Sequence, residues 1–115
     1  MNLFEQIPDK LGEELFTSLL NRDGVRIERI VSDGHASEEG FWYDQPEHEW
    51  ILLVEGSARL VLEEGDGRRR EVLLCSGDTL FLPARCRHRV EETATDRKTI
   101  WLAIFWSPEE ESGNE

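Results

Sequence analysis

The sequence is poor in cysteine and in basic residues. Two cysteines, Cys75 and Cys86, are too few for a disulfide framework, so free thiols in a reducing compartment are expected. The 13 Lys and Arg residues are outnumbered by 25 Asp and Glu, which gives a formal net charge of −12. So acidic a chain does not suit nucleic acid or an anionic membrane.

Long apolar runs and catalytic signatures are also missing. No run of about 18 apolar residues is present, which excludes a transmembrane helix. No basic segment followed by an apolar stretch opens the chain, so no signal peptide is expected and the cytoplasm is the default location. The sequence contains no Gly-rich phosphate loop, serine elbow or paired-cysteine zinc pattern. Its 115 residues fit one domain.

The N-terminal region has the spacing of a helix. Five apolar residues form one stripe between positions 11 and 20: Leu11, Leu15, Phe16, Leu19 and Leu20. Asp9 after Pro8 suits a helix start, and the run 21–24 with its Asp-Gly pair suits a stop. We therefore expect residues 1–24 to be a helical segment, whose stripe is buried against the rest of the domain.

From Val25 onward the pattern is that of short β-strands separated by turn residues. Strands are expected over 25–31, 41–43, 50–54, 58–63, 71–74, 79–82, 89–92 and 98–106. About eight strands at such spacing indicate a sandwich or barrel over residues 25–106. Residues 107–115 are polar and acidic, and a disordered tail is expected there.

Two of these strands, 50–54 and 99–106, are apolar on both faces of their alternation. A strand with one solvated face alternates more cleanly. We therefore expect their outer faces to be covered by the helix or by a second subunit in a homodimer.

Two motifs of the chain carry a family resemblance. Gly77, five residues, Pro83 and then His88 five residues further on form the first, and Glu49, six residues and Gly56 form the second. These resemble the two signature motifs of the cupins, in particular small stand-alone bacterial single-domain cupins. The resemblance covers roughly residues 25–105 and implies an all-β fold, a small antiparallel β-barrel of the jelly-roll type.

The sequence departs from the cupin motifs at several positions. The glycine usually found two residues after the motif's proline is Arg85, and the terminal asparagine is Glu92. The His-x-His pair that precedes the glutamate falls either on Trp42 and Asp44 or on Tyr43 and Gln45, depending on spacing. Neither choice supplies a histidine.

The resemblance implies a site for a divalent transition metal, Fe, Mn, Ni or Zn. It assigns His88 and Glu49 as ligands, and imidazoles with a carboxylate suit such ions. Among the remaining residues, His48 and an oxygen of Asp44 or Gln45 are candidates to complete the set, and Tyr43 is a candidate proton donor. Since neighbouring side chains in a regular strand point to opposite faces, His48 joins Glu49 only if the strand entry is irregular.

Three functions are compatible with the sequence. One is a metal-dependent enzyme acting on a small polar molecule; the second is a metal-free cupin that binds or senses a small ligand, which the missing His-x-His pair favours. The third is a dimeric accessory protein with a vestigial pocket. Cys86 lies between two arginines that favour a thiolate, but no base is evident and a spectator thiol is expected.

Overall fold

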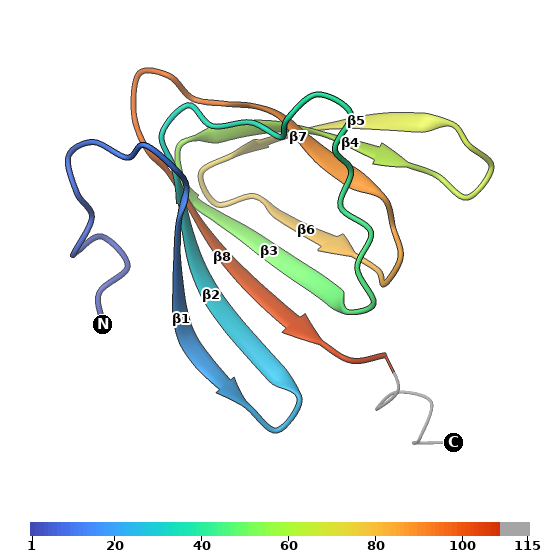
Figure 1. Ribbon diagram of the computed structural model, residues 1–115, viewed down its shortest axis with the longest axis horizontal. Coiled ribbons are helices and arrows are strands. Elements are labelled where there is room, and N and C mark those ends of the chain that lie inside the picture. The colour runs from blue at the N-terminus through green and yellow to red at the C-terminus, as the bar shows by residue number, and fades with distance from the viewer. Residues whose placement is uncertain (109–115) are drawn as a thin grey trace.

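The computed structural model describes residues 1–108, which form eight antiparallel strands and no helix (Figure 1). The strands are β1 (Leu15–Arg22), β2 (Val25–Ser32), β3 (His48–Glu55), β4 (Ser57–Glu63), β5 (Arg69–Cys75), β6 (Thr79–Leu82), β7 (His88–Thr93) and β8 (Thr99–Trp106). The expected all-β jelly-roll architecture is confirmed. The acidic tail expected over 107–115 lies outside the described residues beyond position 108.

The strands form two sheets that face each other. The larger sheet has the order β1-β2-β8-β3-β6 and the smaller one the order β5-β4-β7. Apolar side chains at alternate positions of both sheets point inward and make the core: Ile51, Leu53, Ala58, Leu60, Leu62, Leu74, Leu82 and Trp101. This period of two is what the alternating sequence of β4 predicts, whereas β3, which is apolar on both faces, shows it only in its burial.

The expected N-terminal helix is wrong, because its C-terminal half is strand β1. Asp23 (φ 55°) and Gly24 (φ 78°) both adopt left-handed backbone, the conformation of a two-residue hairpin turn that joins β1 to β2. The pair that resembles a helix stop is therefore a hairpin signal. Two residues of the expected buried stripe, Phe16 and Leu20, are 55% and 41% exposed, so the expectation that the stripe is buried is wrong at these positions.

The segment before β1 crosses the outer face of the larger sheet and is fastened there by Arg29. Its guanidinium donates to the carbonyl oxygens of Leu3 (3.3 Å) and Glu5 (2.6 Å) and to the hydroxyl of Thr17 (3.2 Å). Arg29 is only 1% exposed as a result. An irregular segment thus covers part of the face that the helix was expected to cover.

The rest of that outer face is apolar and incompletely covered. Its outward-facing residues on β3, β6 and β8 are half-buried or exposed: Trp50, Leu52, Phe81, Leu102, Ile104 and Trp106. Phe81 is 48% exposed. A second subunit over this face stays a prediction. Within residues 1–108 there is no helix long and apolar enough to cross a membrane.

Candidate functional site

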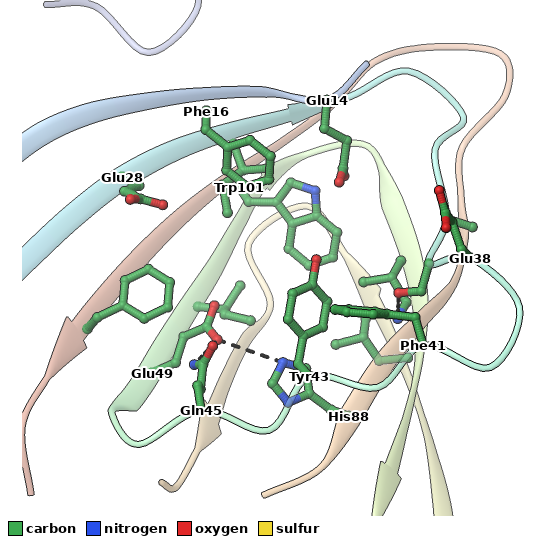
Figure 2. A pocket seen from close by; sticks show the side chains of 17 residues that line it. Glu14, Phe16, Glu28, Glu38, Phe41, Tyr43, Gln45, Glu49, His88 and Trp101 are labelled. Atoms are coloured by element: carbon green, nitrogen blue, oxygen red, sulfur yellow. Dashed lines mark hydrogen bonds and ion pairs between the residues drawn. The ribbon is translucent and has the colours of Figure 1, made fainter. Parts of the chain in front are cut away.

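A cavity of about 410 Å³ lies between the two sheets, on the inner face of the larger one (Figure 2). Five aromatic residues contribute to its wall: Phe16, Phe41, Tyr43, Trp101 and Phe105. Its polar lining includes four carboxylates, an amide and an imidazole: Glu14, Glu28, Glu38, Glu49, Gln45 and His88. A cavity of this size, with apolar walls and a few converging polar groups, is typical of a site for a small organic molecule.

Glu49 reaches the cavity from β3. It pairs with Phe105 of β8 and Leu82 of β6, so its side chain points inward and is only 6% exposed. Burial raises the pKa of Glu49 from 4.5 to about 7, although a hydrogen bond from Gln45 Nε2 to its Oε1 (2.9 Å) and the charge of Arg26 oppose the rise. Glu49 is therefore a carboxyl group that can hold its proton near neutral pH.

His88 approaches Glu49 from the opposite sheet. Its Nδ1 donates to the carbonyl oxygen of Cys86 (2.9 Å), which fixes the ring and turns Nε2 toward Glu49 Oε1, 3.8 Å away. Burial lowers the pKa of His88, while the bond to the Cys86 carbonyl opposes that change. Since burial favours the neutral form of both groups, His88 and Glu49 are not a fixed ion pair at neutral pH.

Tyr43 covers His88 inside the cavity. Its ring stacks on the imidazole (centroids 5.1 Å apart, 17° between planes) and meets Phe41 edge-on (4.8 Å, 87°). Two backbone hydrogen bonds join Tyr43 to His88, although residues 41–43 do not form the expected strand. Burial, followed by the charges of Glu14 and Glu49, raises the pKa of Tyr43, so its phenol stays protonated and can donate a hydrogen bond.

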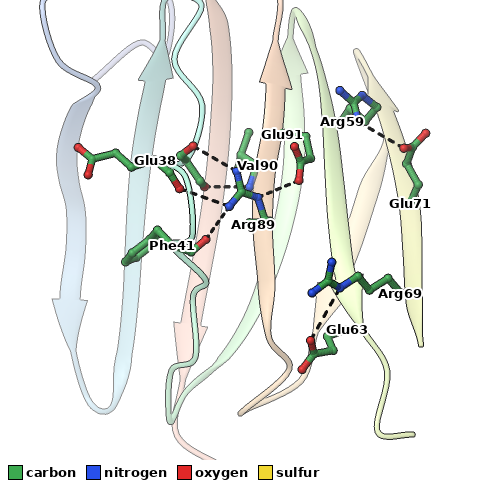
Figure 3. Close-up of polar contacts among 10 residues, drawn as sticks. Glu38, Phe41, Arg59, Glu63, Arg69, Glu71, Arg89, Val90 and Glu91 are labelled. Carbon is green, nitrogen blue, oxygen red and sulfur yellow. Dashed lines mark hydrogen bonds and ion pairs between the residues drawn. The ribbon is translucent and has the colours of Figure 1, made fainter. Parts of the chain in front are cut away.

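The loop of residues 37–41 that closes one side of the cavity is held from outside by Arg89. This side chain donates to the carbonyl oxygens of Ser37 (3.4 Å), Glu38 (3.3 Å) and Phe41 (3.2 Å), as Figure 3 shows in part. Its other neighbour is Glu91, with Nε 2.8 Å from Oε1. Arg89 thereby positions Phe41 in the wall without adding a positive charge to the cavity.

A second set of hydrogen bonds holds the opposite wall. The indole nitrogen of Trp101 donates to Ser32 Oγ (3.1 Å), and this hydroxyl donates to Glu14. The carboxylate of Glu14 is thus placed at the cavity by a neutral donor. Glu14 and Trp101 were not predicted as site residues, because only the pairing of β1, β2 and β8 brings them to the cavity. Arg89 was not predicted either, because it acts from β7 through a loop whose course the sequence does not specify.

The structure does not bring His48 and Asp44 to Glu49 and His88. Strand β3 starts regularly, with His48 opposite Trp106 and Glu49 opposite Phe105, so His48 lies on the outer face. There it accepts a hydrogen bond from the backbone nitrogen of Ala84 (2.9 Å) and contacts the rings of Phe81 and Trp106.

Asp44 belongs to the exposed side of the loop before β3. Its carboxylate is 49% exposed and lies 3.6 Å from the guanidinium of Arg85. Trp42 also faces outward, beneath the guanidinium of Arg69 (4.9 Å). By contrast, Tyr43 and Gln45 both line the cavity, so of the two spacings open for the His-x-His pair the structure favours this one.

The described residues do not form a complete transition-metal site. Glu49 and His88 supply one carboxylate and one imidazole, and no group of three His, Cys, Asp or Glu able to hold an ion exists among residues 1–108. At the two remaining ligand positions stand a phenol, Tyr43, and an amide, Gln45. A catalytic zinc site, for comparison, uses three protein ligands.

A protein from Ralstonia eutropha JMP134, named "putative mannose-6-phosphate isomerase", is 46% identical over 93% of this chain and 96% of its own, with a TM-score of 0.84. A cupin superfamily protein from Desulfitobacterium hafniense DCB-2 has the same fold at 19% identity (88% of this chain, 84% of that one, TM-score 0.69). The chain belongs to the cupin superfamily.

Other cupin structures agree with the fold alone. An oxalate decarboxylase variant from Bacillus subtilis matches 73% of this chain and 21% of its own at 21% identity, with a TM-score of 0.63. No family model matches the sequence, and no curated protein matches it either.

Proposed function

We propose that this cupin binds a small polar organic molecule in its barrel cavity without requiring a metal ion. The observation that supports this most directly is the set of buried polar groups that converge on the cavity: Glu49, Gln45, His88 and Tyr43. Glu49 is 6% and His88 4% exposed, and their facing atoms are too far apart, at 3.8 Å, for a hydrogen bond. Buried polar groups normally find partners, and a bound molecule with hydroxyl groups would supply them.

Each group has a definite capacity toward such a molecule. The Nε2 atom of neutral His88 accepts a hydrogen bond, because the ring proton is on Nδ1, which donates a hydrogen bond to the carbonyl oxygen of Cys86. The phenol of Tyr43 donates one. Glu49 can donate when protonated and accept when ionised, so it can take up or release a proton beside a ligand. This combination allows proton-transfer chemistry and equally supports a binding role.

Ligand binding can be tested by the change in melting temperature with a panel of sugars, sugar acids and amino sugars. A molecule held by these groups should stabilise the wild-type protein, since binding only to the native state raises its stability. The His88→Leu variant should lose the shift while retaining the fold. If no member of a broad panel shifts the wild-type protein, or if His88→Leu binds as well as the wild type, the cavity is not the site.

A metal-dependent enzyme is the second candidate function. It is favoured by the Nε2 atom of His88, which faces Glu49 at the two positions that match cupin ligand positions, and by the Cys86 carbonyl that orients the ring as outer partners of metal ligands do. The metal-ligand set is incomplete, because Tyr43 and Gln45 stand at the positions where two further histidine ligands would be expected.

The double variant Tyr43→His/Gln45→His tests whether these two residues are the reason that the metal-ligand set is incomplete. It would place two further imidazoles at the cavity and should gain about one equivalent of Zn²⁺ or Co²⁺, whereas the wild type should hold far less after dialysis. One equivalent in the wild-type protein, lost in His88→Leu, would support the metal-dependent reading instead.

A further inference from the structure

The cavity carries more negative charge than its surroundings neutralise. Four carboxylates line it, and none of its lining residues is a lysine or an arginine. Arg26 lies close to one side, over the ring of Phe105 (4.0 Å), but it is already paired with Glu28 and with Glu47 (2.7 Å). No ion pair to a cation within residues 1–108 neutralises Glu14 or Glu38.

The aromatic wall adds a second feature that attracts positive charge. Phe41, Tyr43 and Trp101 surround the same end of the cavity as Glu14 and Glu38 (Figure 2). The faces of aromatic rings bind ammonium groups, and this attraction grows when the cation is shielded from water. Carboxylates beside aromatic rings can therefore give one ammonium group both an ion pair and a cation–π contact.

The orientation of His88 at the other end of the same cavity also supports a ligand there. The imidazole of His88 is 4% exposed, and its Nε2 faces the cavity with no hydrogen bond to the described residues. A hydroxyl group of a bound molecule would satisfy it. The cavity thus has an anionic, aromatic end and a hydrogen-bonding end at Glu49 and His88.

We propose that the cavity selects a small polar molecule that carries an ammonium group, such as an amino sugar or amino alcohol, and rejects phosphorylated molecules. This inference rests on the proposed function and specifies its ligand. A phosphate would meet Glu14, Glu28 and Glu38 without a lysine or arginine to bind it, whereas phosphate sites normally employ such side chains or a helix N-terminus. The relative named for mannose 6-phosphate is therefore expected to differ in substrate from this chain.

Three ligands with one ring and different charges test the proposal: mannosamine, mannose and mannose 6-phosphate. Calorimetric titration at a pH that keeps the amine protonated should give mannosamine at least about tenfold tighter binding than mannose, and no detectable binding of mannose 6-phosphate. Butylammonium with butanol, and tetramethylammonium with tert-butanol, repeat the comparison without the ring. The variant Glu14→Gln/Glu38→Gln should bind the cationic probes about tenfold more weakly and the neutral probes unchanged. The variant Phe41→Leu should also weaken the binding of the cationic probes.

Glu71→Gln, on the outer face of the smaller sheet, is the matched control and should bind as the wild type does. Equal affinity for charged and neutral partners overturns the inference and leaves the proposed function standing. Preference for mannose 6-phosphate likewise overturns the inference alone. Failure of every cationic, neutral and anionic probe overturns the proposed function and the inference together.

Discussion

Replacing Glu49 by glutamine should make the domain more stable at neutral and alkaline pH. In the wild type, burial raises the pKa of Glu49 from 4.5 to about 7. Between these values the folded protein holds a proton that the unfolded chain has released, so stability falls as pH rises. Above about pH 7 both states are ionised and the cost is complete; below about pH 4.5 both are protonated and it vanishes.

The size of the effect follows from the pKa rise. At about 1.4 kcal/mol per pKa unit, the burial of ionised Glu49 costs about 3.5 kcal/mol. Glutamine has nearly the same shape, is never ionised and keeps an oxygen that accepts from Gln45. The free energy of unfolding of Glu49→Gln, relative to that of the wild type, should therefore increase by about 3.5 kcal/mol between about pH 4 and pH 8.

Urea denaturation followed by tryptophan fluorescence, at several pH values and with a chelator present, measures this difference. Glu71→Gln is the control, since its carboxylate is 55% exposed and its replacement should change stability by less than about 0.5 kcal/mol throughout. A difference between Glu49→Gln and the wild type that does not vary with pH would refute the reasoning. So would a wild type that gains stability relative to the variant as pH rises, because that result requires a cation beside ionised Glu49.

Three further predictions concern the backbone and the assembly. Arg85 adopts φ 66° at a position where cupins usually have glycine, so Arg85→Gly should raise the free energy of unfolding by up to about 1 kcal/mol, whereas Arg87→Gly, in ordinary backbone, should lower it. Gly56→Ala should lower the free energy of unfolding by several kcal/mol, because a Cβ there would lie 2.7 Å from Thr99 Cα. Gly77→Ala, at a similar φ but with no atom within 4 Å of the new Cβ, should lower it by about 1–2 kcal/mol. Chemical denaturation compares the two variants, and equal losses of stability would contradict the steric argument. Light scattering should show a dimer for the wild type and a monomer for Phe81→Glu; a wild-type monomer of 13.3 kDa would leave the outer face of the larger sheet without a partner.

The sequence predicted the strands well where their alternation is regular. Strand β4 buries every second residue, as its alternating sequence predicts, and turn residues bound it; β3 was predicted from its continuous apolar run instead. Strand β1 was mistaken for a helix because its pairing shifts register between Ser18 and Leu20, which inserts one residue and breaks the period of two. Leu15 and Leu19 are then spaced as in a helix, and only the Asp23-Gly24 hairpin turn indicated otherwise.

The candidate site was predictable only where a motif fixes a strand position. Glu49 and His88 meet because each occupies a defined place on β3 or β7, and sheet pairing determines both directions. Residues 41–47 form a loop whose side-chain directions no periodicity specifies. Whether Tyr43 or Asp44 faces the cavity therefore depended on tertiary contacts, such as the Tyr43–His88 bridge, which the sequence alone did not reveal.

Tyr43 and Gln45 stand where the cupin motif usually has two histidines, and this difference explains the charge distribution of the cavity. An amide and a phenol can hydrogen-bond to a buried carboxyl group, but neither holds a cation beside it. The charge of Arg26, which is already paired with Glu28 and Glu47, offsets the burial of Glu49 only in part, and the pKa of Glu49 rises to about 7. Glu14 and Glu38 also lie at the cavity without an ion pair to a cation within residues 1–108, beside its aromatic wall. A ligand that brings its own positive charge would compensate these groups, and this is the physical reason for which we expect charge, more than ring shape, to determine what the barrel binds.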